Sequence, residues 1–309
     1  VSLPGGCAWG PRPVNFHIEA LKKMGAKIQL KDGNILCSGK LQGSKIKFDK
    51  KSVGATGNII MAAAMASGGT IIENAACEPE IEDLCNFMIK LGVKIDGVGT
   101  EILSISPIEN LEPLDIEYSV IPDRIEAGTF MIAAIMTKGH IMLTNVNPYH
   151  METVIDKLRN VGAYVKLNDN SLEIKFRGKI KPVSIKTLEY PGFPTDLQAQ
   201  WMALMCIADG ESSVTETIYK DRFTHISELL RFGAEISFTN DTANISGIDS
   251  FIAAPVMSTD IRASASLILA ALSTKGISSI SRIYHIDRGY ENIEQKIKNL
   301  GGKIDRLAD

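Results

Sequence analysis

Five short segments recur along the chain at nearly constant spacing, and this repeat limits the possible folds more than any other feature. In each segment the end of an amphipathic helix is followed by Gly and then by a short strand, as in Leu158-Arg-Asn-Val-Gly-Ala-Tyr-Val165. A glycine here suits the left-handed conformation that ends a helix and turns the chain into the next strand. The glycines are Gly25, Gly92, Gly162, Gly233 and Gly301, at spacings of 67, 70, 71 and 68 residues. The chain is therefore an array of internal repeats.

A second pattern recurs in phase with the first: an apolar helix rich in Ala and Met, a Gly, and a strand. Helices that are apolar on every side are buried, so core packing explains these stretches. Each unit then reads as strand, buried helix, strand, amphipathic helix and further strands. This order predicts an α/β fold with helices enclosed by sheets. The apolar helical stretches are residues 58–66, 130–136, 200–207 and 265–272.

The repeats also indicate how the chain divides. Ile121-Pro122-Asp123 lies between the second and third units, so we expect one domain over residues 1–121 and another over 122–309. The first unit is incomplete, because Val1-Ser2-Leu3 stands where the strand after a glycine belongs and no buried helix precedes it. There is no initiator Met and no signal-like start, so we expect a preceding segment to be missing.

Composition excludes several classes of protein. With 309 residues, 45% of them apolar, the chain can bury about two ordinary cores. Its net charge is −3 and its lysines are dispersed, which disfavours nucleic acid as a partner. The longest apolar stretch, residues 59–67, is about half of what a bilayer requires. We therefore expect neither a nucleic-acid-binding nor a membrane-spanning protein.

The cysteines and histidines show no metal-ligand spacing, so no metal or organic cofactor is indicated. Five cysteines without a C-x-x-C pair also argue against a disulfide framework and fit a reducing cytoplasm. We expect Cys37, Cys77, Cys85 and Cys206 to be buried small hydrophobes. Cys7 differs, because it lies in a glycine-rich loop.

Seven stretches together resemble the UDP-N-acetylglucosamine enolpyruvyl transferase family, from Val1 to the C-terminus. They are Val1-Ser-Leu-Pro-Gly-Gly-Cys7 with Gly10-Pro-Arg-Pro-Val14, Asp49-Lys-Lys-Ser-Val-Gly-Ala-Thr56, Glu73-Asn-Ala-Ala-Cys-Glu-Pro-Glu80, Pro122-Asp-Arg-Ile-Glu126, Phe193-Pro-Thr-Asp-Leu-Gln-Ala-Gln200, Thr259-Asp-Ile-Arg-Ala-Ser-Ala-Ser266 and Tyr284-His-Ile-Asp-Arg-Gly-Tyr-Glu291. The resemblance implies two inside-out α/β barrels of three repeats each, with the active site in the cleft between them. Five of six repeat junctions are present, so about the first hundred residues of the family pattern are absent, including a Lys-Asn pair that contacts both substrates.

The implied reaction is an addition followed by an elimination. The 3′-hydroxyl of the sugar attacks C2 of phosphoenolpyruvate, C3 takes a proton, and phosphate then leaves. Cys7 matches the family's catalytic cysteine, and a thiol with a pKa near ~8.5 is protonated at neutral pH and can act as the acid. Pro4, Gly5, Gly6 and Gly10 suit a loop that opens and closes.

The resemblance assigns further roles in substrate binding. Arg12 and Arg288 match arginines that clamp the phosphate and carboxylate of phosphoenolpyruvate. Asp196 matches the residue that contacts the 3′-hydroxyl, where it can act as a base; an Asp at a helix start also caps the helix. Asp260 and Arg262 open another buried helix at the cleft, and the alternative for them is a structural ion pair bridging the domains.

The nucleotide sugar is expected along two segments that precede helices. A helix starting near Asn58 would direct backbone N–H groups at the diphosphate, although ordinary helix initiation explains the same residues. Asn15 departs from the Asp of many members, and the acids Glu78 and Glu80 match positions near the cleft without a derivable role. The expected contacts are Arg12, Pro13, Val14, Asn15, Phe16, Lys50, Ser52, Val53, Gly54, Asp196 and Ile218.

Two alternatives remain beside an active transferase of peptidoglycan synthesis in a bacterial cytoplasm. One is 5-enolpyruvylshikimate 3-phosphate synthase, which shares the fold and chemistry but lacks the Pro-Gly-Gly-Cys loop. The other is a non-catalytic fragment or binding remnant, which the missing first segment supports. The oligomeric state is not indicated by the sequence.

Overall fold

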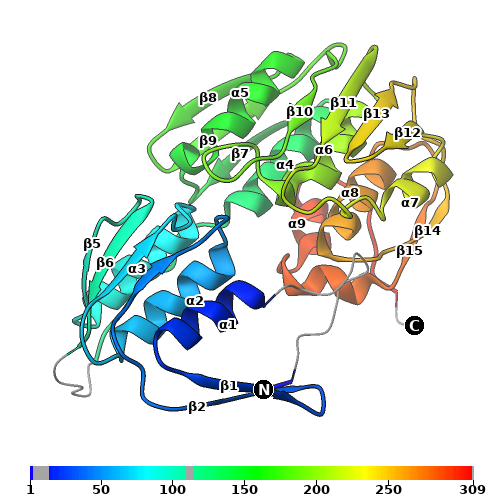
Figure 1. Cartoon of the computed structure of the whole chain (residues 1–309). Helices are drawn as coiled ribbons and strands as arrows, with labels where there is room; N and C mark the ends of the chain where they lie inside the picture. Colours follow the sequence, from blue (N-terminus) through cyan, green and yellow to red (C-terminus); the bar gives the residue numbers. More distant parts are fainter. Residues whose placement is uncertain (3–13, 109–114, 308–309) are drawn as a thin grey trace. The chain divides into compact units, whose positions relative to one another are not determined.

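The computed structural model of the chain describes residues 1–2, 14–108 and 115–307. These residues form two compact units, one extending to Ile121 and the other beginning at Pro122. Figure 1 shows the helices and strands of each unit.

Unit 1 contains a hairpin, a four-stranded sheet and helices packed on them (Figure 1). Its elements are α1 (Asn15–Lys23), β1 (Lys27–Lys31), β2 (Asn34–Ser38), β3 (Lys45–Lys47), α2 (Val53–Ala64), β4 (Thr70–Glu73), α3 (Pro79–Lys90), β5 (Lys94–Asp96) and β6 (Ile102–Ser106). The sheet has the order β3-β4-β6-β5. Val1 and Ser2 pair with β2 in an antiparallel arrangement, as expected for a strand at this point of the repeat.

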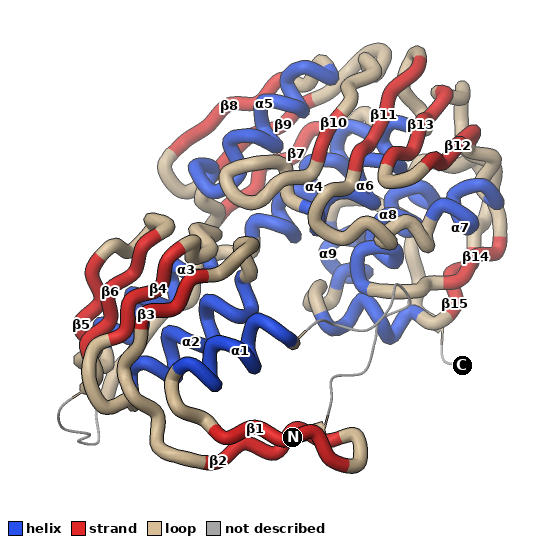
Figure 2. Tube along the Cα trace, viewed as in Figure 1, coloured by secondary structure: helices blue, strands red, loops and turns tan. Residues whose placement is uncertain are grey.

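The described residues of unit 2 form three sheets with helices packed on them (Figure 2). Its elements are α4 (Arg124–Met136), β7 (His140–Thr144), η1 (Pro148–Met151), α5 (Glu152–Val161), β8 (Tyr164–Asn168), β9 (Ser171–Lys175), β10 (Ile185–Lys186), η2 (Thr195–Leu197), α6 (Gln198–Met205), β11 (Glu211–Thr215), α7 (Ile226–Arg231), β12 (Glu235–Thr239), β13 (Thr242–Ser246), β14 (Pro255–Met257), α8 (Ile261–Leu272), β15 (Ser279–Ser281), η3 (Ile283–Arg288) and α9 (Ile293–Asn299). The sheet orders are β7-β9-β8, β10-β11-β13-β12 and β14-β15.

The same strand pairing recurs in several repeats. In three of them the strand before the apolar helix pairs in parallel with the strand after it: β3 with β4, β10 with β11, and β14 with β15. In two of these, a further strand pairs antiparallel with the second strand: β6 with β4, and β13 with β11. The further strand also pairs antiparallel with the strand before it in the chain, β6 with β5 and β13 with β12. The predicted α/β fold is thereby confirmed.

The five repeat glycines adopt the conformation that their position requires. Their φ angles are 93°, 96°, 112°, 86° and 91° for Gly25, Gly92, Gly162, Gly233 and Gly301. Each makes the paired backbone bonds of a Schellman motif. In the third, Gly162 N donates to Arg159 O at 2.9 Å and Ala163 N donates to Leu158 O at 3.1 Å.

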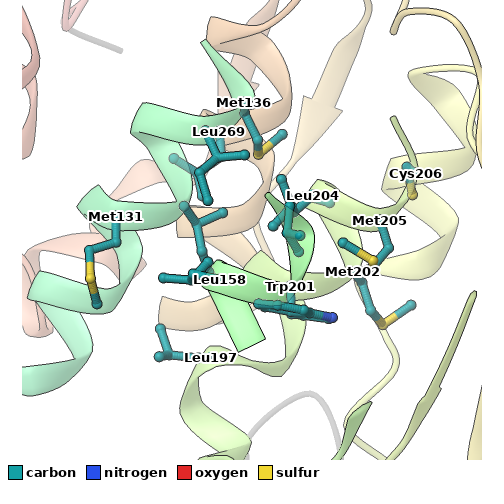
Figure 3. Packing of buried hydrophobic residues seen from close by; sticks show 14 of the residues in the cluster. Met131, Met136, Leu158, Leu197, Trp201, Met202, Leu204, Met205, Cys206 and Leu269 are labelled. Carbon is teal, nitrogen blue, oxygen red and sulfur yellow. The ribbon is translucent and has the colours of Figure 1, made fainter. Parts of the chain in front are cut away.

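The core of unit 2 is formed by α4, α6 and α8 with the inner faces of the sheets. Figure 3 shows Met131 and Met136 of α4, Trp201 of α6 and Leu269 of α8 in this core. These helices pack against one another, which buries them on most sides.

The prediction of complete burial is wrong for α2 in unit 1. This helix packs against α1 and α3, but Met61 is 49% exposed, and Met65 just beyond the helix is 61% exposed. These neighbours and β6 leave the position of Met61 open to solvent. None of the helices in the described ranges is long and apolar enough to cross a membrane.

The prediction for the four cysteines holds in part. Cys85 and Cys206 are buried, and Cys77 is half-buried. Cys37 is exposed, because it lies on the two-stranded hairpin β1-β2, where most side chains face solvent. Burial raises the pKa of the Cys85 thiol to about 11, with the Glu82 carboxylate as a second cause.

Candidate functional site

Asp196 lies in the short helix η2, directly before the buried helix α6. Its carboxylate accepts a hydrogen bond from Arg222 Nη2 at 2.7 Å, and Arg262 Nε lies 3.4 Å from the same oxygen. The Arg222 side chain is 8% exposed and that of Arg262 17%, whereas Asp196 keeps 40% of its side chain exposed. Asp196, Arg222 and Arg262 are called the Asp196 cluster below.

The charges of the cluster determine the protonation of Asp196. Burial alone would raise the pKa of this carboxyl, but Arg222 and Arg262 outweigh burial and lower it. Asp196 is therefore an anion at neutral pH. The expectation that it caps a helix is wrong, because its side chain makes no cap hydrogen bond and its Oδ1 accepts from arginine instead.

A second carboxylate, Glu216, fixes the surroundings of Asp196. Glu216 is fully buried; its Oε2 accepts from the Thr195 hydroxyl at 2.9 Å and its Oε1 from the Thr187 hydroxyl at 2.8 Å. Thr195 Oγ1 in turn accepts from Arg222 Nη1 at 3.0 Å. The predicted contact residue Ile218 is held by the same group, since its backbone N donates to Glu216 Oε1 at 2.8 Å. Asp196 and Ile218 thus belong to one network.

Asp260 and Arg262 stand at the start of α8, as predicted. Asp260 is the N-cap, and its Oδ1 accepts from Arg262 N at 2.8 Å and Ala263 N at 3.1 Å. The Arg262 side chain pairs with Asp196 of the same unit. Its Nη1 is buried and has no hydrogen-bond partner in the described part of the chain. A buried guanidinium nitrogen without an acceptor is suited to an anionic ligand.

Arg288 ends η3 and is exposed. No ion pair joins it to the Asp196 cluster within the described ranges. Its neighbour Gly289 nevertheless lies against Arg262, because a Cβ built on Gly289 would stand 3.6 Å from Arg262 Nη1 and 2.8 Å from Ile261 Cγ2. The segment that carries Arg288 is therefore adjacent to the cluster.

In unit 1 the structure brings together the two segments expected to bind the nucleotide sugar. Val14 is the N-cap of α1, Asn15 is its first residue, and Phe16 packs edge-to-face on Phe48 at 6.2 Å between ring centroids. His17 joins this segment to the other, because a Cβ built on Gly54 would stand 3.3 Å from His17 Nε2. Burial is the main effect on His17 and lowers its pKa, which the backbone of Gly54 partly offsets.

The second segment forms the start of helix α2. Ser52 is the N-cap of α2 and its Oγ accepts from Ala55 N at 3.3 Å. The helix begins at Val53, five residues before the expected start near Asn58, because Ser52 caps it there. Val53 and Gly54 therefore occupy the first turn, where backbone N–H groups have no intrahelical acceptor.

The remaining predicted residues of unit 1 lie on either side of this helix start. Lys50 is exposed, and Lys51 Nζ lies 2.6 Å from Glu101 Oε1. Glu78 precedes α3 without capping it, and its buried Oε2 has no hydrogen-bond partner among the residues described. Glu80 is in the first turn of α3.

Cys7, Arg12 and Pro13 lie outside the described residues. Their roles stay predictions.

Sequence reasoning missed several residues of these networks. Arg222 stands in an unremarkable stretch, Tyr-Lys-Asp-Arg-Phe, and is identified only by its contact with Asp196. Gln200, whose side-chain amide hydrogen bonds to the Asp196 backbone and to Tyr290, lies within a recognised motif, as does Tyr290, so motif membership was an available signal. Glu216 and His17 were detectable only as charged or polar residues whose burial the sequence does not reveal.

The chain matches known proteins over its whole length. Residues 1–297 match the family model described as EPSP synthase (3-phosphoshikimate 1-carboxyvinyltransferase). Two proteins named UDP-N-acetylglucosamine 1-carboxyvinyltransferase, from Geotalea daltonii and Campylobacter hominis, are 50% and 52% identical in sequence to this chain. Each alignment covers 100% of this chain and 74% of the relative.

Solved structures support the same fold. The enolpyruvyl transferase NikO from Streptomyces tendae has a TM-score of 0.86 at 22% identity, covering 94% of this chain and 72% of that one. EPSP synthase from Acinetobacter baumannii has a TM-score of 0.67 at 22% identity, covering 94% and 71%.

Proposed function

Because the chain belongs to the family of UDP-N-acetylglucosamine 1-carboxyvinyltransferases, we propose that it transfers the enolpyruvyl group of phosphoenolpyruvate to the 3′-hydroxyl of UDP-N-acetylglucosamine and releases phosphate. The product would serve peptidoglycan synthesis in a bacterial cytoplasm. The observation that carries the proposal is the Asp196 cluster, a carboxylate held between two guanidinium groups.

The cluster supports binding of a small substrate with more than one negative charge. Phosphoenolpyruvate carries a phosphate and a carboxylate, and arginine binds both groups through paired hydrogen bonds. Arg262 Nη1 is buried without an acceptor in the part of the chain that the structure describes. Arg288 on the adjacent segment and Arg12 of the proposed loop would supply further cationic groups to the same ligand.

The electrostatics also support a conditional role for Asp196 as a base. With Arg222 and Arg262 beside it, its pKa is lowered, and a carboxylate of low pKa accepts a proton weakly. An anionic substrate that draws on the same guanidinium groups would reduce their effect on Asp196. Its pKa would then rise toward the ordinary value, which makes removal of the 3′-hydroxyl proton easier once both substrates are bound.

Unit 1 supports binding of the nucleotide part. The first turn of α2 presents the N–H groups of Val53 and Gly54, and a helix N-terminus favours a phosphate group. The contact between the His17 ring and Gly54 keeps the starts of α1 and α2 together. The two segments that would hold the uridine and diphosphate are thus fixed before the ligand arrives.

In the proposed reaction a C–O bond forms between the 3′-oxygen and C2 of phosphoenolpyruvate as Asp196 takes the hydroxyl proton. Cys7 gives the thiol proton to C3, which completes a tetrahedral adduct. The Cys7 thiolate then takes a proton back from C3, the bond from C2 to the phosphate oxygen breaks, the C2–C3 double bond is restored, and the phosphate leaves with the proton held by Asp196. Arginine side chains stabilise the leaving phosphate.

Phosphate release tests the proposal. The protein expressed from its whole coding sequence is incubated with phosphoenolpyruvate and either UDP-N-acetylglucosamine or shikimate 3-phosphate, with Cys7→Ser as the control. We expect release only with the nucleotide sugar and loss of release in Cys7→Ser. Release only with shikimate 3-phosphate would refute the proposed acceptor, and no release with either would refute the transferase function.

The epoxide fosfomycin tests the role of Cys7 separately. We expect the intact mass to rise by one drug molecule when the protein is incubated with fosfomycin and nucleotide sugar. The Cys7→Ser variant should keep its mass. An unmodified wild-type protein would count against Cys7 as the reactive thiol.

A further inference from the structure

The side-chain amide of Gln200 makes several contacts within unit 2 that are not part of helix α6. It lies in the first turn of α6 and is fully buried. Its Nε2 lies 3.1 Å from the backbone oxygen of Asp196, 3.1 Å from Thr129 Oγ1 and 3.2 Å from Tyr290 Oη. These acceptors come from η2, from α4 and from the segment after η3. One amide therefore joins three separate parts of the fold.

The donors and acceptors around Gln200 admit one consistent arrangement. Thr129 Oγ1 donates to Ile125 O at 2.9 Å, so it accepts from Tyr290 Oη, 2.8 Å away. With its proton used in this way, the Tyr290 hydroxyl accepts from Gln200. The backbone oxygen of Asp196 accepts only, which requires the NH₂ side of the Gln200 amide to face it, and the two N–H donors of this group are shared among the three acceptors.

This network reaches the charged groups of the candidate site. The Arg262 guanidinium group lies over the Tyr290 ring, with its carbon 5.7 Å from the ring centroid. Arg262 also pairs with Asp196 at 3.4 Å. Tyr290 follows Arg288 by two residues. Gln200 thus contacts the backbone of Asp196 on one side and, through Tyr290, restrains Arg262 and the segment of Arg288 on the other.

We infer that Gln200 is a positioning residue: it holds the Asp196 turn and, through Tyr290, Arg262 and the Arg288 segment at the spacing needed to bind phosphoenolpyruvate. The inference rests on the proposed function. Gln200 touches no reacting atom in this account and acts through backbone and arginine geometry. A misplacement of about 1 Å in such a site reduces catalysis by up to about 100-fold.

Gln200→Leu tests the inference, and the chain offers a matched control. Gln198 lies two residues away on the same helical turn and is equally buried, but neither atom of its side-chain amide has a hydrogen-bond partner among the described residues. We expect Gln200→Leu to raise the KM for phosphoenolpyruvate and to lower kcat/KM by about 10- to 100-fold. Gln198→Leu should change both by less than about twofold. Equal effects of the two substitutions, or none from Gln200→Leu, would overturn the inference.

Two further variants keep the test decisive if Gln200→Leu does not fold. Tyr290→Phe and Thr129→Val each remove one acceptor of the Gln200 amide and preserve the shape of the side chain. Each should raise the KM for phosphoenolpyruvate several-fold. Unchanged KM values in both folded variants would overturn the inference.

A substrate-free measurement separates this inference from the proposed function. The unfolding midpoints of wild type, Gln200→Met, Tyr290→Phe and the double variant form a cycle that reports direct coupling. We expect the double variant to be more stable than the sum of the single losses predicts. Additive losses would overturn the inference even in an active enzyme. Coupling in a protein that releases no phosphate with any acceptor would instead refute the proposed function alone.

Discussion

Arg222 Nη2 lies 2.7 Å from Asp196 Oδ1, and the two side chains differ in their access to solvent. Arg222 is 8% exposed, whereas Asp196 is 40% exposed. A buried guanidinium needs a partner for its charge, and a half-exposed carboxylate remains accessible to a ligand. The pair therefore stabilises the fold on one side and presents a functional carboxylate on the other.

Arg222→Met tests the structural part of this relationship. We expect a loss of about 2 kcal/mol in the free energy of unfolding, below the cost of breaking a fully buried pair because Asp196 keeps contact with water. The Asp196 pKa should rise, since one of the two cations that lower it is removed. Chemical denaturation measures the loss. Arg231→Met is the control, because Arg231 is 53% exposed and lies 3.9 Å from Glu228; a similar loss there would contradict the assignment.

His225 predicts a specific dependence of stability on pH. Burial lowers its pKa from 6.5 to about 4, with Asp260 opposing and Arg222 assisting that change. The unfolded chain therefore binds a proton below about pH 6.5 that the folded chain does not accept until about pH 4. The free energy of unfolding should therefore decrease as the pH is lowered from about 6.5 to about 4, and it should level off below about pH 4.

The His225→Gln variant identifies this contribution. The difference in Tm between wild type and variant should be constant above about pH 7 and should shift against the wild type between about pH 6.5 and 4. Thermal unfolding at intervals across this range measures it. A difference that does not vary with pH would show that His225 does not titrate as described.

Gly301→Ala tests the left-handed helix ends of the repeat. Gly301 has a φ of 91° and a Cβ there would meet nothing within 4 Å, so only backbone strain opposes the change. We expect a loss of about 1 kcal/mol in the free energy of unfolding. Gly69→Ala is the control, because Gly69 has no positive φ and its Cβ would lie 3.6 Å from the Ile105 oxygen. A Gly301→Ala protein as stable as the control would contradict the strained geometry.

Ser52 allows helix capping to be distinguished from ligand binding. Ser52→Ala should cost about 1 kcal/mol in stability, whereas Ser52→Gly should cost only a few tenths because glycine is a good N-cap. If the hydroxyl also contacts the nucleotide sugar, both variants should raise the KM for that substrate equally. A KM increase confined to Ser52→Ala would assign the effect to capping. Steady-state kinetics with the nucleotide sugar varied provides the measurement.

Much of the fold could be predicted from local pattern. Glycines such as Gly162 mark helix ends because few other residues tolerate that conformation, and the apolar stretch before Gly139 marks a buried helix. The pattern failed where burial depends on neighbouring elements. Met61 is exposed although its helix is apolar all round. Cys37 is exposed because most side chains of its two-stranded hairpin face solvent.

The site was predictable only where a motif named the residue. Asp196, Asp260 and Arg262 were found through their motifs, but the motif did not reveal that Asp196 pairs with Arg222 instead of capping α6. Arg222 lies 26 residues further along the chain, and no local periodicity relates the two positions. Long-range contacts between side chains require the folded coordinates.

The most direct test of the central claim is the identity of the product. The protein is incubated with phosphoenolpyruvate and UDP-N-acetylglucosamine, and the nucleotide sugar is recovered and examined by mass spectrometry and NMR. We predict a nucleotide sugar that carries one enolpyruvyl group as an ether on the 3′-oxygen, with one phosphate released per product. Recovery of unmodified UDP-N-acetylglucosamine beside intact phosphoenolpyruvate would contradict the claim.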